Sequence, residues 1–223
     1  PAHLAWHRMS NIDGFDGPLP QGWIDAQVEL QKKILERERS LNMKPVLPAF
    51  SGHVPSKIKE IYPSAQITRV KGWAGFPEEN LCHFLAPMDS LYHRIQKEFL
   101  EEQTRLFGTD HIYGVDLFNE VEAPSWDPQT LSDISRNAYE SMSAVDPEAL
   151  WLQMGWMFYY DSRHWTPENI KAYLSAVPQG KVLLLDYYLE NTLVWKRERN
   201  MIRRSFSGNV RYLRTNGLKM SRK

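Results

Sequence analysis

MDSLYHRIQKEFLEEQTRLFGTDHIYGVDLF, residues 88–118, contains a complete helix-to-strand unit. Apolar residues recur at helical spacing over 88–107 with charged residues between them, and Gly108 follows as a residue typical of helix ends. The next apolar run, Ile112–Phe118, has the length and composition of a buried strand. The stretch therefore predicts a helix over 88–107 and a strand over 112–118.

The same alternation extends along most of the chain. Helical periodicity is expected over 21–41, 127–145 and 167–177, and strands over 44–50, 150–155 and 182–188, with another at or just before 4–6. Apolar strands separated by amphipathic helices indicate parallel strands with crossover helices, an α/β fold.

An incomplete (β/α)₈ TIM-type barrel is the expected form of this fold. A full barrel takes about 250 residues, and roughly five strand–helix units precede the C-terminal tail. An open doubly wound sheet is the alternative, but such a sheet normally has a Gly-rich turn after an early strand, which is absent here. Segment 51–80 lacks clear periodicity and is expected to form a long loop after a strand.

Charge is unevenly distributed, although the formal net charge is zero. Residues 196–223 contain ten Lys/Arg and one acidic residue, a charge of +9, and the preceding 195 residues carry −9. We expect one folded domain over 1–195 and a basic, poorly structured tail over 196–223. A nucleic-acid-binding arm on an acidic domain is the alternative function, because Phe206 and Tyr212 are interleaved with the tail's basic residues. A solvated charge run is the plainer interpretation.

Several functional classes lack their usual signatures. No run of about 18 apolar residues is present, so no membrane span is expected. Cys82 is the only cysteine, which excludes an intrachain disulfide and a Cys-based metal site. The sequence has no His-Glu-x-x-His, Gly-x-Ser-x-Gly or phosphate-loop motif. No metal or cofactor is expected.

The dipeptide Asn119-Glu120 follows the predicted strand 112–118. The carboxyl ends of barrel strands open onto the active face, so a carboxylate here suits a sugar-hydrolysing general acid. Asn119 would then hydrogen-bond a sugar substituent while Glu120 protonates the leaving oxygen. The alternative is a carboxylate that only complements a helix dipole.

Four aromatic residues lie near predicted strand ends, where sugars could stack on their rings: Trp6, Trp73, Trp156 and Tyr187. Core packing is the alternative for each ring. Asp116 and Asp186 also lie in predicted strands; Asp186 is either a second carboxylate, a residue that orients Glu120, or a paired structural aspartate.

Seven segments occur in an order that resembles the alpha-N-acetylglucosaminidase family of glycoside hydrolases, over roughly residues 1–200. They are Leu4–Met9, Asp16–Pro20, Pro45–Pro55, Gly108–Gly114, Asp116–Glu120, Gln153–Trp156 and Leu183–Asp186. The resemblance implies a (β/α)₈-type catalytic barrel between a small N-terminal and a helical C-terminal domain. It also implies retaining hydrolysis of terminal alpha-linked N-acetylglucosamine without metal or organic cofactor.

The resemblance also implies roles for individual residues. Glu120 matches the catalytic acid/base, with Asn119 as its companion in the site. The positions that match residues lining the sugar pocket are Trp6, Met9, Trp73, Trp156 and, where the residue type varies, Tyr187. The expected partner is a glycan with terminal alpha-linked N-acetylglucosamine, and the full-length enzyme is expected to be secreted, periplasmic or lysosomal.

The family's nucleophilic glutamate has no counterpart in this chain. A retaining mechanism needs two carboxylates about 5–5.5 Å apart, but the sequence after Arg197 lacks both the expected aromatic-rich strand and a nucleophile candidate. The family's N-terminal sugar-contacting region is also missing. We therefore expect a fragment, with a frame change near Met201 as one origin, that is inactive without the enzyme's missing N- and C-terminal regions.

Overall fold

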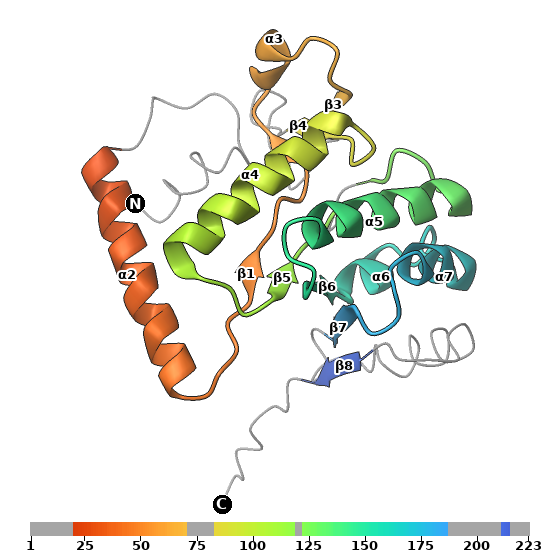
Figure 1. Cartoon of the computed structure of the whole chain (residues 1–223). Helices are drawn as coiled ribbons and strands as arrows, with labels where there is room; N and C mark the ends of the chain where they lie inside the picture. The colour runs from red at the N-terminus through yellow and green to blue at the C-terminus, as the bar shows by residue number, and fades with distance from the viewer. Residues whose placement is uncertain (1–19, 71–82, 119–121, 187–210, 215–223) are drawn as a thin grey trace, which may run out of the picture. The chain divides into compact units, whose positions relative to one another are not determined.

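The structure, a computed structural model, describes residues 20–70, 83–118, 122–186 and 211–214 (Figure 1). The chain forms two compact units. Unit 1 comprises Pro1–Tyr113 with Glu140–Ala149, and unit 2 comprises Gly114–Tyr139 with Leu150–Lys223.

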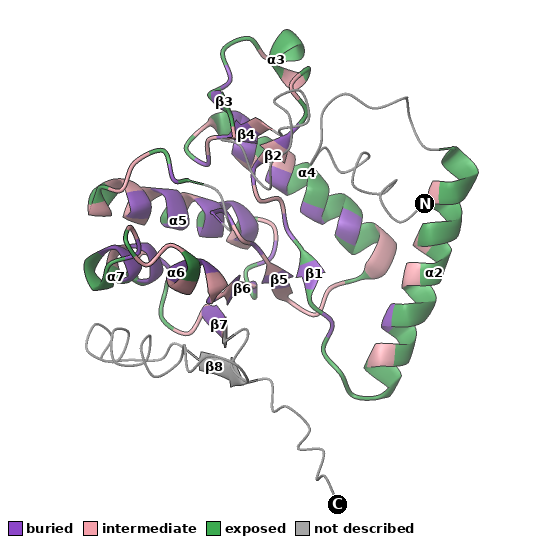
Figure 2. Ribbon diagram, turned by 180° about the vertical axis from the view of Figure 1, so that it is seen from behind, coloured by how far each residue is buried: buried purple, intermediate pink, exposed green. Residues whose placement is uncertain are grey.

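Two long helices of unit 1 confirm the predicted periodic segments. Helix α2 spans Gln21–Ser40, and helix α4 spans Ser90–Phe107. The Asp89 side chain caps α4 by accepting a hydrogen bond from the Leu91 backbone N–H at 2.8 Å. Gly108, with φ of 71°, ends the helix as the sequence predicts. Most of α2 is exposed, and Leu35 is its buried residue (Figure 2).

The strand expected over 44–50 is shorter than predicted. Strand β1 covers Leu47–Pro48 and lies next to β5, Ile112–Gly114, in the strand order. Side chains of α4 bind the backbone around β1. Gln103 Nε2 donates to the Pro48 carbonyl, and Gln96 Oε1 accepts from the Phe50 N–H, at 2.8 and 2.7 Å. These contacts replace part of a strand ladder, which explains the short strand.

Segment 51–80, expected to be a loop, contains regular structure. Strands β2 (His53–Val54) and β3 (Ile67–Arg69) flank β4 (His83–Leu85) in an antiparallel sheet. Register pairs are Val54 with His83 and Thr68 with Phe84. The short helix α3, Ile58–Ile61, lies between β2 and β3 in the chain.

Unit 2 contains parallel strands in the order β6–β7–β8, spanning Leu150–Met154, Val182–Asp186 and Arg211–Arg214. Leu152 pairs with Leu183, and Leu184 pairs with Tyr212. Helices α6 (Trp156–Tyr160) and α7 (Pro167–Ser175) connect β6 to β7. This crossover between parallel strands confirms the α/β prediction.

The start of α7 shows how local sequence sets an element boundary. The Thr166 side chain accepts a hydrogen bond from the Asn169 N–H, and Pro167 occupies the first helical turn. Helix α5, Pro128–Ser143, has an equivalent cap in Asp127, whose carboxylate accepts from the Thr130 N–H at 2.9 Å. The core of unit 2 is aromatic, with Trp151, Trp165 and Tyr173 fully buried.

Strand β8 lies inside segment 196–223, which the sequence sets apart as a basic tail. The other residues of that segment lie outside the described residues. The domain boundary between 195 and 196 therefore stays a prediction.

Candidate active site

Among the predicted site residues, Trp156 is the one that the structure describes. Glu120, Asn119, Trp6, Met9, Trp73 and Tyr187 lie outside the described residues. The site can therefore be built from the elements that lead into residues 119–120 and from those that follow β6.

Phe118, the residue that precedes Asn119, is buried. The sequence predicts a strand to Phe118, but β5 ends at Gly114 and residues 117–118 form a turn. Phe118 is 2% exposed, and its ring lies 6.4 Å from Trp165 and 6.3 Å from Tyr173, measured between centroids. This packing fixes Phe118, the last described residue before Asn119 and Glu120.

Asp116 explains why the ladder stops early. Val115 N–H donates to the Leu152 carbonyl of β6 at 3.2 Å. At the next position of β6 the Met154 N–H instead donates to Asp116 Oδ1, at 3.0 Å. A carboxylate thus takes the place of a backbone acceptor at the carboxyl end of β6.

Asp116 also begins a buried polar chain that joins three elements. Gln153 Nε2 donates to Asp116 Oδ1 at 2.6 Å, and the Tyr173 hydroxyl of α7 donates to Gln153 Oε1 at 3.3 Å. Gln153 and Tyr173 are both 0% exposed. Burial raises the pKa of Asp116 to about 6, against the lowering effect of the bonds from Met154 and Gln153.

Trp156 begins α6, and Gly155 separates it from the end of β6. The Gly155 N–H donates to the Leu185 carbonyl at 2.9 Å, which fixes the turn between β6 and α6 to β7. The half-buried Trp156 ring lies 5.5 Å from Tyr159 and 6.1 Å from Tyr160. Asp186 is the last residue of β7, and its side chain lies outside the described part, so its three interpretations stay open.

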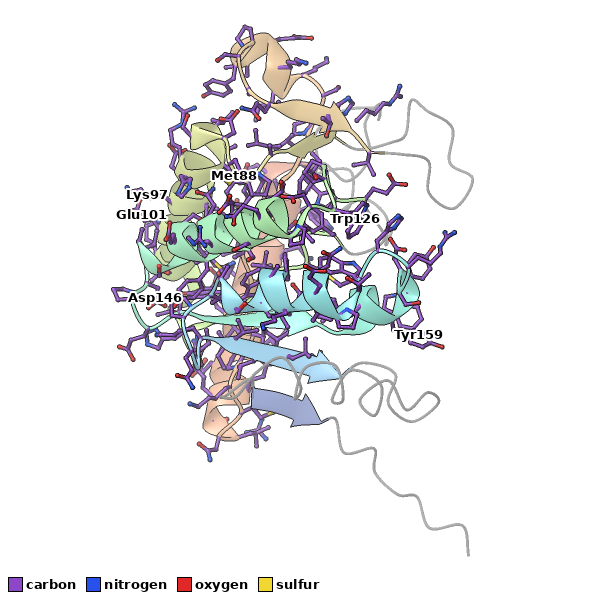
Figure 3. The ribbon with its side chains drawn as sticks, turned by 90° about the vertical axis from the view of Figure 1, so that its right-hand side faces the viewer. Met88, Lys97, Glu101, Trp126, Asp146 and Tyr159 are labelled. Atoms are coloured by element: carbon purple, nitrogen blue, oxygen red, sulfur yellow. The ribbon has the colours of Figure 1, made fainter. Side chains whose placement is uncertain are left out.

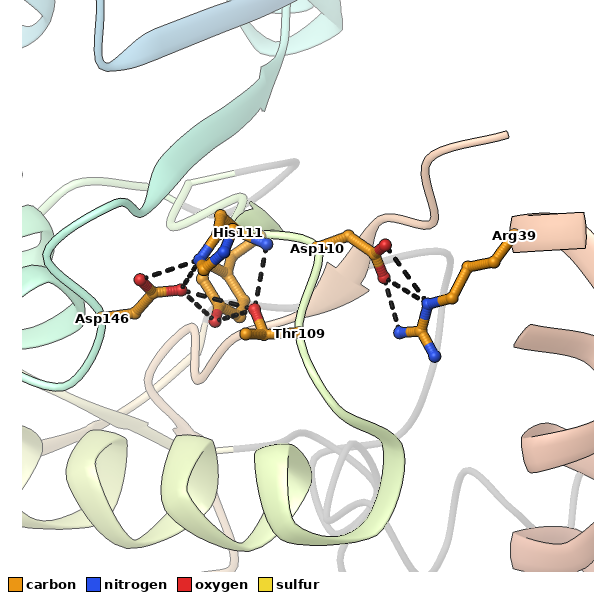
Figure 4. Close-up of polar contacts among 6 residues, drawn as sticks. Arg39, Thr109, Asp110, His111 and Asp146 are labelled. Carbon is orange, nitrogen blue, oxygen red and sulfur yellow. Dashed lines mark hydrogen bonds and ion pairs between the residues drawn. The ribbon is translucent and has the colours of Figure 1, made fainter. Parts of the chain in front are cut away.

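A second titratable cluster lies in unit 1 (Figure 4). Asp146 accepts hydrogen bonds from the Tyr113 hydroxyl at 2.7 Å and from His111 Nδ1 at 2.8 Å. Burial works to raise the pKa of Asp146, but these bonds outweigh it and hold the pKa below its usual value. Arg39 of α2 separately forms an ion pair with Asp110 at 2.6 Å. These contacts hold the loop before β5 in place, a structural role.

Sequence reasoning missed Gln153 and Tyr173 as partners of Asp116. Gln153 could have been found, because a glutamine in the otherwise apolar run 150–155 needs a buried partner. Within the described residues, no group of three or more His, Cys, Asp or Glu side chains is arranged to hold a metal ion. None of the described helices is long and apolar enough to cross a bilayer.

Residues 1–210 match the family described as the alpha-N-acetylglucosaminidase (NAGLU) TIM-barrel domain. The chain belongs to this family. This membership confirms the predicted resemblance, the partial TIM barrel and the assignment to an enzyme family of glycoside hydrolases. A curated relative, alpha-N-acetylglucosaminidase of Homo sapiens, is 45% identical over 198 residues, 88% of this chain and 27% of the relative.

Solved structures of family 89 glycoside hydrolases also match the chain. A family 89 glycoside hydrolase from Clostridium perfringens in complex with 2-acetamido-1,2-dideoxynojirmycin matches with a TM-score of 0.71 and 28% identity. The same family's CpGH89 variant with two Glu-to-Gln substitutions, in complex with its substrate GlcNAc-alpha-1,4-galactose, matches with a TM-score of 0.72 and 28% identity. Each match covers 90% of this chain and 22% of the other chain. The chain thus spans about a quarter of the length of these relatives.

Proposed function

We propose that this chain is the acid/base-bearing part of a retaining glycoside hydrolase that releases terminal alpha-linked N-acetylglucosamine. The observation that carries the proposal is the family match over residues 1–210, which includes the segment Asp116–Glu120. Glu120 donates a proton to the leaving glycosidic oxygen and later removes one from water, while Asn119 hydrogen-bonds the sugar.

The sugar pocket is lined by aromatic residues and one methionine. Trp156 supports this assignment by its place, because it lies two residues beyond Met154, the last residue of β6, and is half-buried. The other proposed lining residues are Trp6, Met9, Trp73 and Tyr187. Their rings would pack against the C–H faces of the sugar, and polar groups would fix its orientation.

The second carboxylate comes from outside these 223 residues in this proposal. A retaining hydrolase forms a covalent glycosyl-enzyme on that carboxylate, so residues 1–223 bind the sugar without completing turnover. The proposed partners are the glycan and the enzyme's remaining N- and C-terminal regions. A secreted, periplasmic or lysosomal location follows from where such glycans occur.

Binding of 2-acetamido-1,2-dideoxynojirmycin tests the role of Glu120, since a protonated imino sugar pairs with a carboxylate. Calorimetric titration of purified 1–223 should show saturable binding, and Glu120→Gln should weaken it by at least about tenfold, or 1.4 kcal/mol. Glu122→Gln, the same change two residues further on, is the matched control and should bind as the parent does. Absence of binding to a chain that is folded by circular dichroism would overturn the proposal.

A further inference from the structure

Helix α6 presents three aromatic rings on one turn. Trp156, Tyr159 and Tyr160 are spaced as i, i+3 and i+4, and the Trp156 ring contacts both tyrosines, at 5.5 and 6.1 Å between centroids. The interplanar angles are 43° and 31°, so the rings form a gently tilted surface. Tyr160 is 58% exposed.

The opposite face of the same turn supplies the packing that holds α6 on the sheet. Met157 and Phe158 are 1% and 3% exposed, and the Phe158 ring lies edge-on to Trp165 at 5.1 Å. Met157 and Phe158 therefore supply the buried packing of α6, and the outer rings remain on the other face. Isolated exposed apolar side chains are ordinary, but contiguous aromatic rings on one turn are typical of a binding surface.

The position of this surface relates it to the proposed sugar site. Because α6 starts one residue after β6, its rings lie at the carboxyl end of that strand, where barrel enzymes bind substrate. Figure 3 shows Tyr159 and Trp126 on the side of unit 2 toward which the β7 arrow points. The surface is therefore continuous with Trp156, a proposed lining residue of the pocket.

Polar contacts fix the loop that follows α6. Asp161, next to Tyr160, accepts a hydrogen bond from His164 Nδ1 at 2.7 Å. The His164 ring stacks on Trp126 with centroids 4.5 Å apart and an interplanar angle of 8°. Trp126 in turn meets Trp165 edge-on at 5.2 Å. These contacts hold the end of α6 in one place, as a rigid ligand platform requires.

We infer that Tyr159 and Tyr160 extend Trp156 into a stacking platform for the second sugar of the substrate, on the reducing side of the cleaved bond. The inference rests on the proposed function and adds the residues that select a glycan over a simple glycoside. The occupant is a neutral pyranose, whose apolar C–H face packs on aromatic rings. The complex of the Clostridium perfringens relative with its substrate GlcNAc-alpha-1,4-galactose shows that such an enzyme accommodates a second sugar.

The test compares two ligands on the folded 1–223 chain: methyl alpha-N-acetylglucosaminide, which has no second sugar, and GlcNAc-alpha-1,4-galactose. Dissociation constants are measured by calorimetry or ligand-observed NMR. Tyr160→Ala should weaken binding of the disaccharide about five- to tenfold and leave the methyl glycoside unchanged. Tyr160→Phe keeps the ring and should bind the disaccharide nearly as the parent does.

Phe99→Ala, which removes an exposed ring from α4, is the control for a general effect of losing an aromatic residue. The platform is overturned if Tyr160→Ala changes both ligands equally or neither. Failure of both ligands to bind the parent chain would instead overturn the proposed function, so the two failures are distinguishable.

Discussion

At Asp116, burial and hydrogen bonding act on one carboxylate in opposite directions. Burial disfavours the charged form, whereas the N–H groups of Met154 and Gln153 favour it, and burial dominates. The resulting pKa of about 6 means that the folded protein binds the Asp116 proton more tightly than the unfolded chain, whose aspartate pKa is 3.8. Stability linked to this group is present below the unfolded value and is lost as pH rises toward 6.

Asp116→Asn should remove this pH dependence. Asparagine keeps an oxygen to accept from Met154 and Gln153 but carries no charge, so the variant should gain stability relative to the parent as pH rises from 4 to 7.5. Asp116→Ala leaves the Met154 N–H without its acceptor, although Gln153 Nε2 keeps the Met154 carbonyl, and should cost about 1–3 kcal/mol. Urea unfolding across this pH range measures both effects. Parallel stability curves for the parent and the asparagine variant would contradict the assignment.

At the scale of elements, the small antiparallel sheet of unit 1 depends on a close approach at Gly52. The Leu85 N–H donates to the Gly52 carbonyl at 2.8 Å, and the Phe84 ring lies against the glycine. Gly52 has a φ of 101°, which L side chains rarely adopt, and a Cβ there would lie 2.7 Å from a Phe84 ring carbon. Both the backbone and the packing therefore require glycine.

Gly52→Ala should destabilise the chain through both effects. The positive φ costs roughly 1–2 kcal/mol, and the collision with Phe84 adds about 1–3 kcal/mol. Gly180→Ala is the matched control, because Gly180 has a φ of 80° but no atom within 4 Å of an added Cβ. Denaturant titration should show a larger loss for Gly52→Ala. Equal losses would show that the Phe84 ring moves aside freely.

At the scale of the whole molecule, the proposed function places the two carboxylates of the reaction in different parts of the enzyme. The proposed retaining mechanism joins an acid/base to a nucleophile. Glu120 is the proposed acid/base, and the nucleophile is proposed to lie outside these 223 residues. Residues 196–223 carry a charge of +9 and the preceding residues carry −9, so the last part of the chain differs from the rest in charge.

Purified 1–223 should therefore not hydrolyse a chromogenic alpha-N-acetylglucosaminide faster than its Glu120→Gln variant. The reason is that no glycosyl-enzyme forms without a nucleophile. Release of the chromophore, followed over hours at pH 4.5 and 7, measures this. Turnover that disappears in Glu120→Gln would support the role of Glu120 but disprove the need for an outside carboxylate.

Element types were predictable wherever local sequence is self-consistent. The periodicity of 88–107, the caps at Gly108 and Thr166, and the apolar runs of β6 and β7 each depend on residues within a few positions of one another. Strand ends were less predictable. The apolar run predicts a strand that extends to Phe118. It does not show that the Asp116 side chain, rather than a backbone carbonyl, accepts the hydrogen bond from the Met154 N–H.

The sequence by itself determined the α/β alternation, the family and the candidates Glu120 and Trp156, because periodicity and ordered motifs are properties of the chain. Only the tertiary structure decided that Asp116, Gln153 and Tyr173 form one buried polar chain, and that Tyr159 and Tyr160 share a surface with Trp156. These two arrangements depend on contacts between residues distant in the chain and on which face of helix α6 packs against the core. Burial and mutual contact, which set the pKa of Asp116 and the exposure of Tyr160, exist only once the chain has folded.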